Sequence, residues 1–84
     1  MTSDEIRKHI VATPFKPFWI HVADGRRIAV RARDFILVSP QGRLVDIYQP
    51  DDAHDILEVF HVTGVSFDPV PSVAVNEQAQ PSTA

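Results

Sequence analysis

The chain has no cysteine, only three glycines, and no apolar run that approaches the ~20 residues a bilayer-spanning helix needs. Without cysteine, neither a disulfide framework nor a thiolate metal site can support the core. The three glycines stand far apart in the sequence, so no glycine-rich loop is present to cradle a phosphate group. Because the chain has only 84 residues, it forms one domain at most, with a small core.

The formal net charge is small, at −3, because the eight basic residues are nearly balanced by eleven acidic ones. This value argues against a protein held on nucleic acid by bulk phosphate attraction. The distribution is more informative, since half of the eight basic residues lie in one short segment, at Arg26, Arg27, Arg31 and Arg33. An acidic group follows at Asp51, Asp52, Asp55 and Glu58. Either the two groups are solvated faces that pair with each other, or the arginines form an anion-binding stripe.

The N-terminal segment predicts a helix over residues 3–12. Thr2 followed by Glu5 fits a capping box, in which the two side chains satisfy backbone N–H groups at the helix start. Ile6 and Ile10 share one face at helical spacing, and Pro14 ends the helix because it disfavours a helical residue before it. A helix of about three turns is too short to persist alone, so we expect it to dock on a sheet.

Short strands and turns fill the segment from Phe18 onward. Residues 18–22 alternate in polarity, and the Asp24-Gly25 pair that follows is a strong hairpin signal. Further strands are predicted over residues 27–33, with a basic outer face, over residues 35–38, covered on both sides, and over residues 44–48. Residues 56–59 continue the sheet, and a corner near Phe60 and His61 leads into a last strand over residues 62–67.

These elements predict a mainly β fold with one N-terminal helix docked on a small, bent, five-stranded antiparallel sheet or barrel of the SH3-like kind. A split α+β sheet is the alternative. The domain covers residues 1–67, and residues 68–84, which lack periodicity, are predicted to be a disordered tail. The expected core comprises Ile6, Ile10, Phe18, Ile20, Ile28, Val30, Phe35, Leu37, Ile47, Leu57 and Val65.

Residues for catalysis or metal binding do not form a recognisable set. The four histidines lack the HxH or HExxH spacing of a metal site, and no serine lies in a G-x-S-x-G elbow. We therefore expect no catalytic residues, no metal and no cofactor, and hence no enzyme. The best candidate for chemistry is the arginine segment with Trp19, whose ring either stacks on an unpaired base or packs under the helix.

Two resemblances extend this interpretation. The segments PFKPFWIHVADGR, RDFILVSPQGR and VTGVSF resemble those of a family of short uncharacterised bacterial proteins, a family that implies no activity. The helix followed by a bent sheet is similar in topology to the Sm-like RNA-binding fold, including its Hfq type. That resemblance implies ring assembly through the last two strands and RNA contacts near His61. Here Phe60 precedes His61, where the Hfq type carries a lysine.

We therefore expect a small non-enzymatic protein-interaction or accessory module, with a single-stranded RNA binder as the alternative. The alternative would use Arg26, Arg27, Arg31, Arg33, Trp19 and His61. Self-association through the uncharged strand at residues 62–67 is expected in either case, because an edge strand exposes unpaired backbone groups. The acidic N-terminus lacks the character of a signal peptide, so the expected location is the cytoplasm, with no membrane contact.

Overall fold

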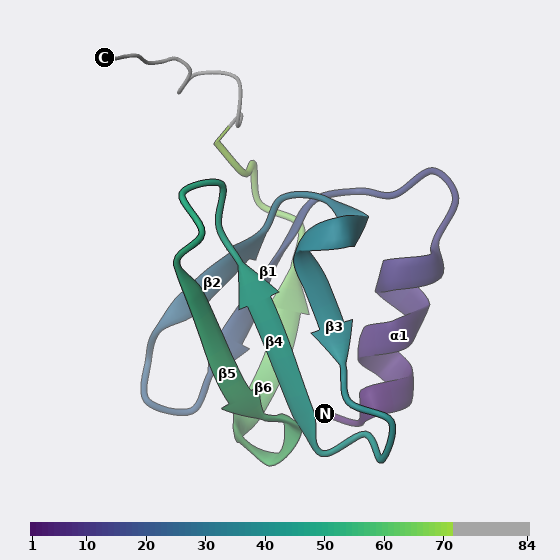
Figure 1. The fold of residues 1–84 in the computed structure, drawn as a ribbon, viewed down its shortest axis with the longest axis vertical. Helices are drawn as coiled ribbons and strands as arrows, with labels where there is room; N and C mark the ends of the chain where they lie inside the picture. Colours follow the sequence, from purple (N-terminus) through teal and green to yellow (C-terminus); the bar gives the residue numbers. More distant parts are fainter. Residues whose placement is uncertain (72–84) are drawn as a thin grey trace.

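The computed structural model describes residues 1–71. Over these residues the chain is mainly β with one N-terminal helix, and six strands form two small antiparallel sheets (Figure 1). Sheet A has the strand order β2-β1-β6 and sheet B the order β3-β4-β5. The elements are α1 (Ser3–Val11), β1 (Phe18–Val22), β2 (Arg27–Val30), η1 (Arg33–Phe35), β3 (Ile36–Val38), β4 (Leu44–Tyr48), β5 (His54–Glu58), η2 (Val59–His61) and β6 (Val62–Ser66).

Helix α1 begins at the predicted capping box and ends one residue before the predicted end. The Thr2 side chain accepts a hydrogen bond from the Glu5 backbone N–H at 3.3 Å, and the Glu5 carboxylate accepts one from the Thr2 backbone N–H at 2.9 Å. The second bond leads the causes that lower the pKa of Glu5. Ile6 is fully buried, and α1 lies beside β3 (Figure 1). The helix therefore docks on the sheet structure, as predicted.

Sheet A forms around β1, whose alternation is visible in the burial pattern. Phe18, Ile20 and Val22 are buried, whereas Trp19 and His21 lie on the other face and are half-buried. The β1–β2 hairpin turns at Asp24-Gly25, where Gly25 has φ +94°, a conformation that residues with a Cβ atom adopt only at a cost. The predicted hairpin is therefore confirmed.

Sheet B is built from two successive hairpins. Register pairs Leu37 with Asp46 and Asp46 with Ile56, so these three side chains form one row across the outer face. Val45, Ile47 and Leu57 point the other way and are buried against sheet A. The β3–β4 turn needs Gly42, which has φ +74°, and an added Cβ atom would stand 2.6 Å from Ser3 Oγ at the start of α1.

The five-stranded single sheet expected from the sequence differs from the two three-stranded sheets observed. The chain crosses between the sheets twice, once at η1 and once at η2. A 3₁₀ turn bonds locally and interrupts the ladder, so β2 ends at Val30 and β3 begins only at Ile36. The expected corner near Phe60 and His61 is η2.

Most of the expected core is confirmed, with one clear error. Leu37 is 68% exposed, because no described element covers the outer face of sheet B. The interpretation of the continuous apolar run 35–38 as a strand covered on both sides is therefore wrong. Phe35 lies in η1 and is half-buried, and Ile10 and Val65 pack at the core margin. Buried residues that the expected list lacks are Val22, Ala29, Ile36, Val45, Val59 and Val62.

The expected tail begins at Asp68, and only its first four residues are described. Residues 68–71 contact the outer face of sheet A, as set out below. Residues 72–84 lie outside the described part of the chain, so disorder there stays a prediction.

Candidate interaction surfaces on the two sheets

The outer face of sheet A carries Trp19, His21 and Arg27. Antiparallel register sets Trp19 opposite Ala29 and His21 opposite Arg27, which brings these side chains to one surface. The Arg27 guanidinium lies 4.1 Å from the centroid of the Trp19 ring, a cation–π arrangement. Part of the predicted basic and aromatic set is thus assembled, with Trp19 on the outer face.

Residues 68–71 run over this surface and occupy its polar groups. The Trp19 indole N–H donates to the Asp68 carbonyl oxygen at 3.1 Å, and the Asp68 carboxylate lies 3.6 Å from Arg27. Arg31 donates through one guanidinium nitrogen to the Pro71 carbonyl oxygen. The ring expected to stack on a base is therefore covered in part by the protein's own chain.

A row of polar contacts fixes the start of this segment. His21 Nε2 lies 2.7 Å from Ser66 Oγ, and the Ser66 hydroxyl donates to the Asp68 carboxylate at 3.3 Å. A nucleophilic serine needs its proton directed at the imidazole, with the carboxylate on the far side of the ring. Here the serine stands between the other two groups, an order suited to holding Ser66 and Asp68 in place.

The other residues of the predicted RNA site lie elsewhere. Arg26 contacts Asp24 at 2.8 Å and Asp55 at 3.7 Å, and Arg33 donates to the carbonyl oxygens of Ile10 and Ala12 at the end of α1. His61 lies in η2 with its Nε2 3.8 Å from Glu58. The four arginines and His61 therefore do not share one face. Within residues 1–71, only Arg26 among the four arginines pairs with the predicted acidic group.

Asp24 shows how closely one of these arginines is engaged. Its carboxylate accepts from the Arg26 backbone N–H at 3.0 Å and from Arg26 Nε at 2.8 Å. The backbone hydrogen bond is the main cause that lowers the pKa of Asp24. Arg26 is thus part of the hairpin turn.

Gln49 links the two sheets, a role that sequence reasoning missed. Its amide nitrogen donates to the Ala29 carbonyl oxygen at 3.0 Å, and its amide oxygen accepts from Arg31 Nε at 3.0 Å. The side chain thereby satisfies one carbonyl group of β2, the edge strand of sheet A. No local pattern signals such a residue, because its partners are 18 and 20 positions away.

The outer face of sheet B has the opposite chemistry. Its outward side chains include four large hydrophobic residues, here called the apolar face: Leu37 (68% exposed), Leu44 (43%), Tyr48 (42%) and Ile56 (60%). Asp46 lies in the middle of this face with its carboxylate 2.8 Å from His54 Nδ1, and the centroid of the His54 ring stacks 4.6 Å from that of Tyr48. The sequence of residues 44–48 is apolar at four of its five positions, so it does not indicate which of these side chains face outward.

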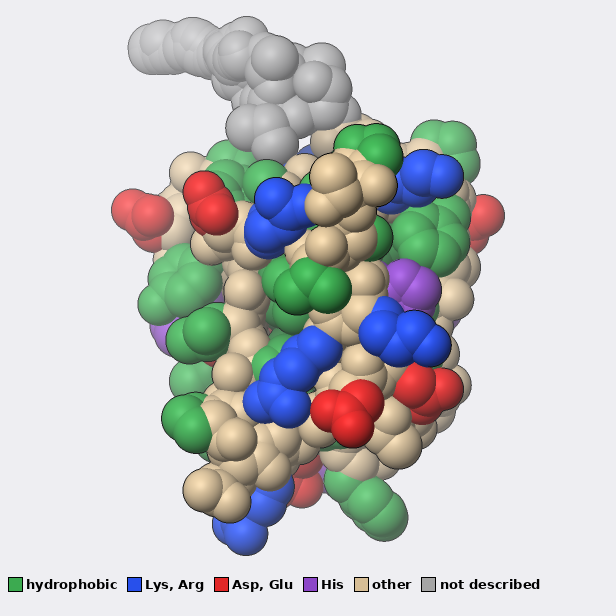
Figure 2. All heavy atoms as spheres, turned by 90° about the vertical axis from the view of Figure 1, so that its right-hand side faces the viewer, with side chains coloured by type: hydrophobic (Ala, Val, Ile, Leu, Met, Phe, Trp, Pro, Cys, Tyr) green, Lys and Arg blue, Asp and Glu red, His purple; other side chains and the backbone are tan. Residues whose placement is uncertain are grey.

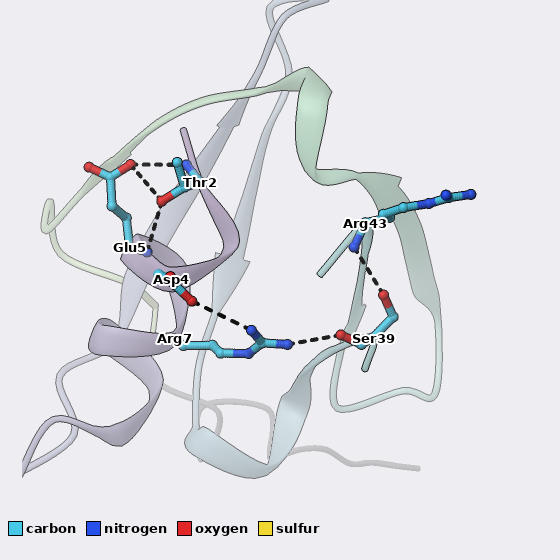
Figure 3. Close-up of polar contacts among 6 residues, drawn as sticks. All are labelled: Thr2, Asp4, Glu5, Arg7, Ser39 and Arg43. Carbon is cyan, nitrogen blue, oxygen red and sulfur yellow. Dashed lines mark hydrogen bonds and ion pairs between the residues drawn. The ribbon is translucent and has the colours of Figure 1, made fainter. Parts of the chain in front are cut away.

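An open groove of about 1040 Å³ adjoins the apolar face at Leu44. It runs between the start of α1, the β3–β4 turn and Phe60, which is 89% exposed. The Arg7 guanidinium ties helix to turn, because it lies 3.7 Å from Asp4 and donates to the Ser39 carbonyl oxygen at 2.9 Å (Figure 3). The Arg43 side chain points away from this pair (Figure 3). The groove therefore has a fixed wall and one exposed aromatic ring.

The face that carries α1 offers no comparable surface. Basic and acidic side chains are interspersed on it, with small apolar areas between them (Figure 2). Such a mixture gives no large field of one sign.

Comparisons with known proteins add no family to this description. No family model, no curated protein and no solved structure matches the chain. Within residues 1–71, no three side chains of His, Asp or Glu are grouped so that they could hold a metal ion. No helix in the same range is long and apolar enough to cross a membrane.

Proposed function

We propose that this chain is a small, non-enzymatic protein-interaction module that binds another protein through the apolar face of sheet B. The observation that carries the proposal is the row in which Leu37 and Ile56 flank Asp46, with both apolar side chains more than half exposed. Exposed large apolar side chains gathered on one face are typical of protein-binding surfaces. The neighbouring groove extends this surface past Leu44 to Phe60.

The charges around the apolar face indicate the chemistry of the partner. Asp46 lies at its centre, Glu58 at one end, and the β4–β5 turn adds Asp51 and Asp52. A partner segment with apolar side chains flanked by lysine or arginine would bury Leu37 and Ile56 and pair with these carboxylates. We propose such a basic, amphipathic segment as the ligand.

The fold we propose for this module is a bent barrel of the SH3-like or Sm-like kind. The order of strands supports it, since β2 and β3 are consecutive and belong to different sheets, as expected of two halves of one bent strand. The resemblance to short bacterial proteins, a cytoplasmic location and self-association also stay as proposals, and none of them assigns a ligand. The edge first expected to pair, β6, has its Val62 carbonyl oxygen bonded to the N-terminal amine, so a different edge is argued below.

A site-specific crosslinking experiment tests the proposal. A photo-crosslinking residue at position 37, introduced in cells of the source organism, is expected to capture a defined protein, whereas the same residue at Asp34 is not. Excess wild-type protein should compete for that adduct, and excess Leu37→Lys should not, because a lysine on the apolar face opposes a basic partner. Equal capture at both positions, or equal competition by both proteins, contradicts the proposal.

Single-stranded RNA binding is the second candidate, favoured by the Arg27–Trp19 stack alone. Arg27 lies over this ring, and Arg31 joins it only through residues 68–71, which both arginines contact in the described part of the chain. Two phosphate contacts give a slope of about −1.4 in log affinity against log salt, against roughly −2 to −3 for the full set of arginines. Titrating a short RNA at several salt concentrations measures this slope. Measurable binding that Arg27→Ala weakens would favour RNA, and absence of binding at low salt removes it.

A further inference from the structure

The β5 edge differs from the other three sheet edges in what covers it. On β2, the Ala29 carbonyl oxygen accepts from Gln49, and on β6 the Val62 carbonyl oxygen accepts from the N-terminal amine at 3.3 Å. On β3, the edge lies beside α1. Within residues 1–71, no comparable cover is found on β5, which is the outer strand of sheet B on the side away from α1 (Figure 1).

The register shows which backbone groups of β5 are free. The Gln49 N–H donates to the Ala53 carbonyl oxygen at 2.7 Å, and the Val59 N–H donates to the Arg43 carbonyl oxygen at 2.8 Å. These two bonds fix the hydrogen-bonded positions of the β4–β5 ladder at every second residue, which includes Asp55 and Leu57. The N–H and C=O groups of the intervening residues, His54, Ile56 and Glu58, therefore point away from β4.

The side chains at these three positions are complementary to themselves. In an antiparallel pair with a second β5 strand, centred on Ile56, His54 of one chain stands opposite Glu58 of the other, and Ile56 meets its own copy. His54 Nδ1 is engaged with Asp46, which leaves Nε2 for the facing carboxylate. The free backbone groups would form about six hydrogen bonds across the dyad.

The neighbouring elements leave this edge accessible. Arg26 approaches β5 from the β1–β2 hairpin, but it does so at Asp55, whose side chain shares the inward side with the buried Leu57. Glu58 is exposed, and its contact with His61 is a long 3.8 Å. Neither contact uses the backbone groups of the edge.

We propose that the β5 edge is a self-association site at which a second copy of this chain adds its own β5, joining two copies of sheet B into one six-stranded sheet. This inference shares only sheet B with the proposed function. The partner at the β5 edge is a second copy of this chain, whereas the partner at the apolar face is another protein. A dimer formed here leaves Leu37 exposed on the outer face. The two sites can therefore be tested separately.

The test is a pair of charge variants measured by sedimentation velocity up to high micromolar concentration. Wild-type protein is expected to dimerise. His54→Glu should dimerise about tenfold less tightly, because it places two carboxylates opposite one another twice in the dimer. Glu58→Lys should also dimerise less tightly, because each His54 then loses the carboxylate that faces it. Mixed together they should form a heterodimer, since the introduced glutamate then faces the introduced lysine, and the other pair of facing residues is the native one.

Matched controls separate the effect of where the new charges lie from the effect of the change in net charge. Gln41→Glu and Asp34→Lys add the same side chains away from the edge, and both should leave the dimer unchanged. Loss of the dimer in either control would mean that overall charge, and not the β5 edge, governs self-association.

A second pair guards against a variant that misfolds. Ile56→Lys sets two ammonium groups together at the dyad and should abolish the dimer, while Leu37→Lys makes the same change on the same face away from the edge and should retain it. Circular dichroism checks that both are folded. A monomeric wild type, a dimer that tolerates Ile56→Lys, or no heterodimer on mixing overturns the proposal. If Leu37→Lys still dimerises but no longer competes for the crosslinked partner, the β5 edge and the apolar face are separate sites.

Discussion

The outer face of sheet A carries Trp19, His21 and Arg27, and the polar groups of all three have partners in the same chain. The outer face of sheet B carries Leu37 and Ile56, each more than half exposed. Both faces belong to three-stranded antiparallel sheets of similar length, so backbone geometry does not explain the contrast. Residues that look functional by charge are occupied within the fold, and residues that look like core by hydrophobicity are left exposed.

The contrast predicts that truncating Trp19 harms the fold far more than truncating Leu37. We expect Trp19→Ala to lower the free energy of unfolding by about 2–3 kcal/mol, because the ring loses its packing with Arg27 and the indole N–H loses the Asp68 carbonyl. Urea denaturation followed by circular dichroism measures the loss. A full retention of stability would mean that the ring is free, as a stacking platform for RNA requires.

Gln49→Ala is expected to have the next largest effect, because it removes the link between the sheets. The loss of two hydrogen bonds, one of them to a charged guanidinium, should lower the free energy of unfolding by about 1–2 kcal/mol. Gln49→Glu keeps the acceptor for Arg31 but sets a carboxylate oxygen against the Ala29 carbonyl oxygen, so it should also lower the free energy of unfolding. Gln41→Ala, in an exposed turn, is the matched control. If Gln49→Ala lowers the free energy of unfolding no more than Gln41→Ala does, Gln49 does not link the two sheets.

Leu37→Lys should leave the free energy of unfolding within about 0.5 kcal/mol of wild type, because the side chain is 68% exposed. The same urea denaturation measures it. A large loss would show that the apolar face is covered within the folded chain, and the proposed partner site would then be wrong.

The smallest expected effect concerns acid stability at the β1–β2 turn of sheet A. Hydrogen bonds from Arg26 lower the pKa of Asp24 in the folded state below its usual 3.8. The ionised form is favoured by folding, so this contribution is present above about pH 3.8 and is lost as the pH falls through the lower folded value. Asp24→Asn should therefore show a slightly shallower fall of Tm with acid than wild type. The effect is modest because the Asp24 carboxylate is exposed. If the curves of Tm against pH for wild type and Asp24→Asn are parallel, Asp24 contributes nothing to acid stability.

Local signals in the sequence predicted the elements well. The Thr2–Glu5 capping box and Pro14 located the helix to within one residue, and the alternation at residues 18–22 indicated β1 with correct bounds. The turn at residues 40–43 and the polar loop after Tyr48 bounded β4 correctly. These signals succeed because capping, turns and side-chain period depend on residues a few positions apart. The candidate site was less predictable. Of its six residues, only Trp19, Arg27 and Arg31 lie along one surface, and that surface has residues 68–71 against it.

Capping, turn and side-chain patterns by themselves determined that a mainly β fold with one helix would result. Which sides are covered was decided only by the tertiary structure. Leu37 and Ile36 are equally apolar, yet Ile36 faces sheet A and Leu37 faces outward. The arginines likewise found partners at Gln49, Asp55, Asp68 and the end of α1, all distant in sequence. Burial and pairing depend on which segments meet in space, and no local pattern encodes that meeting.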